Sequence, residues 1–211
     1  MRRIKMLGFA GMMIAAVMAV IGMGTASAAG GVLCSTATTP CGSKWPTGTT
    51  VDMSLQNGTA SRVTDTSGNT IESCSTSTIK GSLAANPDAS GTATVTITEL
   101  TWGAGGSCTV TKDTIVLGAL KFESESSGNG IIYADAKTEW TINVFSSCGY
   151  GVEAGTKLGT LKEGTGTSAV FTVNAVIKKL NGGFLCPETE KWVAEYVLTS
   201  PPATTLYVSA S

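Results

Sequence analysis

Residues 168–186 read SAVFTVNAVIKKLNGGFLC, and residues 91–108 read GTATVTITELTWGAGGSC. Both segments contain an alternating apolar stretch, then a Gly-Gly pair, then a cysteine. In the first segment, apolar side chains recur at every second position: Ala169, Phe171, Val173, Ala175 and Ile177. This spacing places side chains on one face of a β-strand, so each segment predicts a strand with one buried side.

The alternation in the second segment changes phase. Val95 and Ile97 occupy odd positions, whereas Leu100 and Trp102 occupy even ones. One extra residue in the strand, a β-bulge, would return all four side chains to the same face. We therefore predict a bulge near residues 98 and 99.

The likeness extends to two longer units. Each begins with a cysteine, passes through a turn rich in Gly, Ser and Thr, forms the alternating strand and closes with a second cysteine before another apolar stretch. We interpret residues 29–211 as a single domain with two quasi-repeats, about 50–124 and 125–211. Their apolar faces are expected to pack together.

Turn signals such as QNG, NPDASG, SSGNG and LNGG recur roughly every 8 to 14 residues. The sequence DTSGN, at 65–69, predicts a hairpin turn in which Asp65 accepts local backbone hydrogen bonds. Helical spacing is absent from the sequence that follows the N-terminal apolar run. The prediction is an all-β fold, an antiparallel β-sandwich or barrel of about ten strands built from the two units and stapled by disulfides.

The N-terminus has the layout of a signal peptide. Arg2, Arg3 and Lys5 precede an apolar run, and Ala26 and Ala28 supply the small residues of a cleavage site. We predict a signal peptide over 1–28, and hence a protein that is secreted or held at the extracellular cell surface. No stable membrane insertion is expected once this segment has been removed.

All six cysteines follow the predicted signal peptide, and an even number in an exported chain indicates three disulfides. Six cysteines allow 15 pairings, but the repeat favours one of them: Cys34–Cys41, Cys74–Cys108 and Cys148–Cys186. The chain has no histidine and no C-x-x-C pair, so neither a metal nor another cofactor is expected.

The charge and composition narrow the function classes. Removal of the signal peptide leaves 11 basic and 15 acidic side chains, a formal charge of −4, without a Lys or Arg cluster, so nucleic acid is not an expected partner. Without histidine, Ser-His-Asp and Cys-His catalysis are excluded, although a carboxylate pair could still serve a glycan-active enzyme. Ser and Thr supply about a quarter of the chain, well above the usual share, which predicts a neutral, hydroxyl-rich surface.

Aromatic side chains offer candidate binding positions. The alternation assigns Trp102 and Trp140 to the core, together with Ile142, Val144 and Cys148 in one continuous stretch. Trp45 and Tyr150 lie in segments rich in Gly, Pro and Ser. We therefore select Trp45 and Tyr150 as candidates for stacking on a sugar ring.

The expected mature start, LCSTATTPCGSKWPTGTTVDMSLQNGTA, pairs two cysteines with a Pro-Thr-Gly turn and an amphipathic strand. It resembles an uncharacterised group of secreted, cysteine-containing β proteins of actinobacteria and related soil bacteria, and the resemblance implies no activity. In layout alone the chain is also similar to secreted bacterial proteins described as activators of alkane oxidation or as biofilm matrix components. That similarity implies an extracellular structural role.

These observations predict a secreted, non-enzymatic structural, surface or adhesion protein of the cell envelope or extracellular matrix. Its expected partners are extracellular polysaccharide, or other copies of itself joined through strand edges. A carbohydrate-binding module is the alternative, and a glycan-active enzyme that uses a carboxylate pair is the third hypothesis.

Overall fold

A computed structural model describes residues 30–38, 40–87, 91–103, 108–126, 128–143, 147–164, 168–201 and 206–210. The described residues form fifteen β-strands, which confirms the all-β prediction but exceeds the expected ten. None of them belongs to a helix long and apolar enough to cross a membrane. The predicted signal peptide, 1–28, lies outside the described residues.

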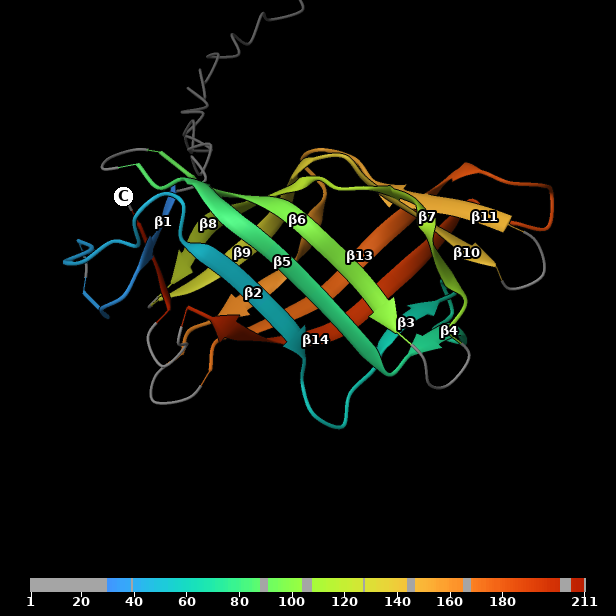
Figure 1. The fold of residues 1–211 in the computed structure, drawn as a ribbon, viewed down its shortest axis with the longest axis horizontal. Helices are drawn as coiled ribbons and strands as arrows, with labels where there is room; N and C mark the ends of the chain where they lie inside the picture. Colours follow the sequence, from blue (N-terminus) through green and yellow to red (C-terminus); the bar gives the residue numbers. More distant parts are fainter. Residues whose placement is uncertain are drawn as a thin grey trace, which may run out of the picture.

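Eight antiparallel strands close into a barrel (Figure 1). The barrel strands are β2 (Thr50–Leu55), β5 (Thr76–Ala85), β6 (Ala93–Gly103), β8 (Ala119–Ser126), β9 (Asn129–Ala136), β12 (Lys157–Lys162), β13 (Val170–Asn181) and β14 (Thr189–Ser200). They follow one another around the wall in chain order, and the pairing of β13 with β14 closes the ring. The structure therefore selects a barrel from the two expected architectures.

Five further strands build a second body, which we call the lobe. It consists of β3 (Ser61–Thr64), β4 (Thr70–Cys74), β7 (Val110–Val116), β10 (Thr138–Asn143) and β11 (Ser147–Val152), set around the far ends of β13 and β14. β3 pairs with β14 on one side, and β11 pairs with β13 on the other. In Figure 1 these five strands lie to the right of the barrel.

A short two-stranded sheet joins the ends of the described chain. β1 (Gly31–Cys34) pairs with β15 (Tyr207–Ala210), and isolated bridges link Gly30 to Glu123 and Gly128 to Val208. These bridges attach the small sheet to β8 and to the start of β9.

The predicted bulge in β6 is confirmed. Lys80 lies opposite Glu99 and Gly81 lies opposite Ile97, so Thr98 is the extra residue. The shift buries all four apolar side chains that the change of phase had separated: Val95, Ile97, Leu100 and Trp102. The predicted alternating face is confirmed as well, since Ala169, just before β13, and the four alternating apolar residues within β13 are at most 1% exposed.

The stretch from Trp140 to Cys148 differs from the prediction. It was read as one strand, but β10 ends at Asn143 and β11 begins at Ser147, and the two strands pair antiparallel. Trp140 and Ile142 are nevertheless buried, because alternation fixes the face of each strand even where the chain reverses. Val144 lies outside the described residues.

A polar network marks the junction of the barrel and the lobe. Ser61 Oγ accepts hydrogen bonds from the indole nitrogens of Trp102 (3.3 Å) and Trp192 (2.9 Å). The rings of Trp102, Trp140 and Trp192 lie 5.5 to 6.3 Å apart, centroid to centroid. One hydroxyl therefore satisfies two buried donors within an aromatic cluster.

We expect Ser61→Ala to lower the free energy of unfolding by about 2 to 6 kcal/mol, because two buried N–H groups lose their acceptor at roughly 1 to 3 kcal/mol each. Urea denaturation followed by tryptophan fluorescence measures the change. Ser73→Ala, on the partly exposed face of the neighbouring β4, is the matched control and should alter stability by less than about 0.5 kcal/mol. Equal effects of the two substitutions would contradict the assignment.

Candidate functional site

The barrel interior is filled by side chains. The apolar space beneath Trp45 has a free volume of about 10 Å³ and is bordered by residues such as Leu33, Leu83, Phe122 and Leu206. That is scarcely room for one water molecule, and an apolar lining offers it no partner. This space is therefore too small to hold a ligand.

Trp45 packs over this end of the barrel. Its ring is partly buried against the hydrophobic core, and its indole nitrogen is buried without a hydrogen-bond partner among the described residues. Asn86 holds the segment in place, because its amide binds the backbone oxygens of Leu33 (2.8 Å) and Trp45 (2.9 Å). Sugar stacking by Trp45 stays a prediction, and its packing gives the ring a structural role.

The three predicted disulfides are all present: Cys34–Cys41, Cys74–Cys108 and Cys148–Cys186. Cys74 ends β4 and Cys108 lies just before β7, and these are the two outermost strands of the large sheet. This disulfide therefore joins the two edges of the sheet and closes the lobe.

Glu72 lies beside the same disulfide. A carboxylate oxygen of Glu72 and the sulfurs of Cys74 and Cys108 lie within 4.8 Å of one another, a spacing compatible with a metal site. The sulfurs are bonded to each other, whereas a metal binds thiolate. Glu72 instead accepts hydrogen bonds from the backbone nitrogen and the hydroxyl of Thr109, so the cluster serves to close the lobe.

Among the residues that the structure describes, the most exposed large apolar side chains occur at the turn between β13 and β14, residues 182–188, which we call the hairpin tip. Phe184 is 94% exposed and Leu185 is 61% exposed. Large apolar side chains held in water signal a contact surface when the backbone that carries them is ordered. The hairpin tip is therefore our candidate site.

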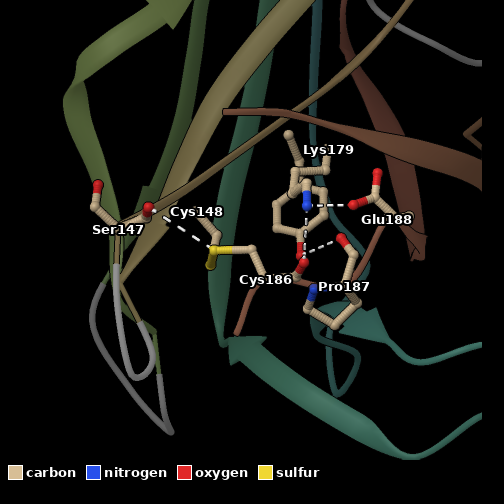
Figure 2. A network of polar contacts seen from close by, with 7 residues as sticks. Ser147, Cys148, Lys179, Cys186, Pro187 and Glu188 are labelled. Carbon is tan, nitrogen blue, oxygen red and sulfur yellow. Dashed lines mark hydrogen bonds and ion pairs between the residues drawn. A yellow bond between two sulfur atoms is a disulfide. The ribbon is translucent and has the colours of Figure 1, made fainter. Parts of the chain in front are cut away.

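A disulfide fixes one side of the hairpin tip (Figure 2). Cys186 is bonded to Cys148 on β11, and its sulfur also lies 3.9 Å from the backbone oxygen of Ser147. Gly182 has a φ of +123°, and a Cβ there would meet the sulfur of Cys186 at 2.5 Å. Only glycine fits this position, both for its backbone conformation and for the space that the disulfide occupies.

Polar contacts fix the other side. Lys179 forms an ion pair with Glu188, and its amine donates to the backbone oxygen of Cys186 at 3.3 Å (Figure 2). The hydroxyl of Tyr150 donates to the backbone oxygen of Pro187 at 3.1 Å. Bonds from β13 and from β11 therefore hold the backbone of Cys186 and Pro187 in place.

Tyr150 was selected for stacking, and the structure corrects this. The residue lies in β11 rather than in a loop and is 3% exposed, so its ring presents no face to a ligand. The neighbouring glycines reflect close packing, since a Cβ on Gly149 or Gly151 would come within 2.6 Å of Asn181 or Thr138. Burial and the nearby Glu190 and Glu188 raise the pKa of Tyr150 to about 12, so its hydroxyl stays protonated as a donor.

Glu190 lies near the base of the tip, on the inward face of β14. It is 1% exposed, and neither carboxylate oxygen has a hydrogen-bond partner among the described residues. Burial, and secondarily the charge of Asp65, raises the pKa of Glu190 to about 7. The predicted turn at Asp65 is confirmed, because its carboxylate accepts the backbone nitrogens of Ser67 and Asn69 at 2.9 and 2.8 Å.

Sequence reasoning missed the residues of this site. Phe184 and Leu185 were counted in a strand-turn repeat, although their place between Gly-Gly and a cysteine, outside any alternation, was a signal of exposure. Glu190 shares its parity with the buried Trp192 and Tyr196, so alternation alone could have placed it inside.

Comparisons of this chain with protein-family models, with curated proteins and with solved structures find no match. The resemblance to secreted actinobacterial proteins stays a prediction.

We expect Gly182→Ala to destabilise the hairpin tip, since it combines an unfavourable positive φ with a collision against Cys186, at about 1 to 3 kcal/mol. Gly183→Ala is the matched control, because a Cβ there meets no atom within 4 Å. Thiol alkylation followed by mass spectrometry should find free thiols at 148 and 186 only in the first variant. Full oxidation and unchanged stability of Gly182→Ala would contradict this packing.

The raised pKa of Glu190 predicts how stability depends on pH. The folded protein holds a proton that the unfolded chain releases above its ordinary pKa of 4.5, so stability is full below about pH 4.5 and falls as pH rises through about 7. Glu190→Gln removes this dependence on pH. The free energy of unfolding of the variant should therefore exceed that of the native protein by about 1 to 3 kcal/mol at pH 8 and equal it at pH 4. Urea titrations at both pH values measure the difference, with the exposed Glu125→Gln as the control.

Proposed function

We propose that this protein is a non-enzymatic extracellular surface or adhesion protein that acts through its outer surface. The observation that carries the proposal is the braced hairpin tip, which holds Phe184 and Leu185 in water while disulfide and polar contacts fix the backbone beneath them. Keeping such side chains exposed is unfavourable unless a partner covers them.

The disulfides and the interior support the same proposal. Three disulfides suit an oxidising, extracellular compartment. The space beneath Trp45 is too small for a substrate. Glu72 on β4 is engaged by Thr109, and Glu190 on β14 is buried, so neither is available as one of the two carboxyl groups that a glycosidase brings to its substrate.

Self-association by strand addition is less favoured than contact through the tip. The outermost strands of the large sheet, β4 and β7, are tied to each other by Cys74–Cys108. A tied edge offers fewer free backbone groups to an incoming strand. Contact through side chains at the tip needs no free edge.

Carbohydrate binding remains the second candidate because of a polar groove beside the turn between β2 and β3. The groove has a volume of about 310 Å³ and is lined by amides and hydroxyls, including Gln56, Asn57, Thr59 and Thr78. Such groups can hydrogen-bond to a sugar. Loss of polysaccharide binding in Gln56→Ala or Asn57→Ala would support this second candidate.

The proposal predicts saturable binding of the exported, oxidised protein to washed cells of its source. Replacing Phe184 and Leu185 together by serine should weaken binding by about tenfold or more, since both apolar side chains lose their contact. Sedimentation of cells with the labelled protein measures the bound fraction.

A matched control pair lies elsewhere on the surface. Val116 and Leu117 are also adjacent, apolar and exposed, at 47% and 41%. Their replacement by serine should leave cell binding unchanged. Absence of binding to cells, or equal losses in the two double variants, would overturn the proposal.

A further inference from the structure

The hairpin tip is a small convex apolar surface surrounded by polar residues. Its exposed neighbours are glycines, Pro187 and polar or charged residues such as Asn181 and Glu188. Phe184 and Leu185 together offer on the order of 300 Å² of side-chain surface, about half of the roughly 600 Å² that each partner contributes to a small specific protein interface. A lipid surface accepts so small a contact, because it is fluid and needs no complementary shape.

Basic residues gather on the outer face next to the tip. Lys178 on β13 and Arg62 on β3 are exposed, and Lys191 on β14 is partly exposed. Strand register places Lys191 between them and diagonal to both, since it pairs with Val176, two residues from Lys178, and with Thr64, two residues from Arg62. Within the described part of the chain, none of the three basic residues forms an ion pair.

Nearby acidic side chains reduce the positive charge of this strip without cancelling it. Glu188 is paired with Lys179, and Glu190 points inward. Asp65 stays ionised, because hydrogen bonds within its turn lower its pKa. Glu195 lies two residues from Val193, the partner of Arg62, so three basic side chains stand beside two acidic ones. The whole chain carries a formal charge of −1, so this strip is a local departure from the overall charge.

We propose that the hairpin tip is a lipid-contact site, which inserts Phe184 and Leu185 into the surface of an anionic membrane while Arg62, Lys178 and Lys191 face the phosphate headgroups. The inference rests on the proposed adhesion function and names the chemistry of its partner. Apolar insertion beside basic residues is the usual combination for reversible binding at an interface. The contact is peripheral, since two side chains reach no deeper than the boundary of headgroups and acyl chains.

The contacts that brace the tip favour binding by fixing its backbone in advance. The tip already has a fixed backbone, through Cys148–Cys186 and the Tyr150 hydrogen bond to Pro187. Little backbone ordering is therefore needed on binding, and ordering is a main opposing term in association.

The test uses the full oxidised protein with vesicles of phosphatidylcholine alone and of phosphatidylcholine mixed with phosphatidylglycerol. We expect binding to the anionic vesicles, weakened by added salt, and at least about tenfold weaker binding in Phe184→Ser with Leu185→Ser. Lys178→Gln with Lys191→Gln should weaken binding by about fivefold or more. Val116→Ser with Leu117→Ser should bind like the native protein.

A reporter distinguishes insertion from simple attraction of charges. In Phe184→Trp, the fluorescence emission should shift to the blue with anionic vesicles and should be quenched by lipids brominated in the acyl chains. Circular dichroism and disulfide mapping of each variant establish that the fold is retained, and the exposure of these side chains favours this.

The inference is overturned if anionic vesicles are not bound, if the Phe184 and Leu185 variant binds them normally, or if the reporter shows no shift. Loss of cell binding in that variant without any binding to vesicles would leave the adhesion function standing and assign the tip to a protein or polysaccharide partner. Absence of both cell and vesicle binding would remove the adhesion function as well.

Discussion

The pairing of β13 with β14 is the constraint on which both bodies of this protein depend. Residues 170–178 pair with residues 189–197 without a shift of register. One part of this ladder closes the barrel, where β12 and β2 flank it, and the other part carries the lobe, where β11 and β3 take over. A slip of β14 by one residue would turn both Trp192, beside the lobe, and Tyr196, in the barrel, outward at once. The hydrophobic burial that fixes this register is therefore shared, which couples the lobe and its tip to the stability of the barrel.

The two disulfides of the predicted units occupy corresponding places around this ladder. The first half contributes β2, β5, β6 and β8 to the barrel, and the second half contributes β9, β12, β13 and β14. In each half, a hairpin of the lobe lies in the chain between the first two barrel strands: β3–β4 in the first half and β10–β11 in the second. Cys74 and Cys148 lie in these hairpins, and each is bonded to a cysteine that follows the third barrel strand of its own half. One disulfide closes the lobe between β4 and β7, while the other braces the hairpin tip. The same covalent device thus gives stability in one half and a fixed contact surface in the other, whereas descent of the halves from a repeat stays a prediction.

Features that depend on neighbouring residues in the sequence could be predicted. Alternation placed the apolar residues of β13 inside, the change of phase located the bulge at Thr98, and the repeat selected one pairing of six cysteines. Strand partners distant in sequence, such as β14 with β2, leave no local signal, so barrel closure and the lobe were beyond prediction. Tyr150 was misplaced because its flanking glycines read as a loop, although they serve close packing. The basic strip was missed because strand register alone makes Lys178 and Arg62, which are distant from each other in the sequence, diagonal neighbours of Lys191.

Glu190 shows how the lobe accommodates the tip. A buried carboxylate without a partner is unfavourable when ionised. Its pKa is therefore raised to about 7, and the folded protein is more stable when Glu190 is protonated. It lies two residues from Glu188, which holds Lys179, and its charge bears on Tyr150, which holds Pro187. Ionisation of Glu190 would therefore place a desolvated charge next to the groups that brace the tip. Strain of this kind is tolerated because the disulfide and the ladder between β13 and β14 hold the same segment independently.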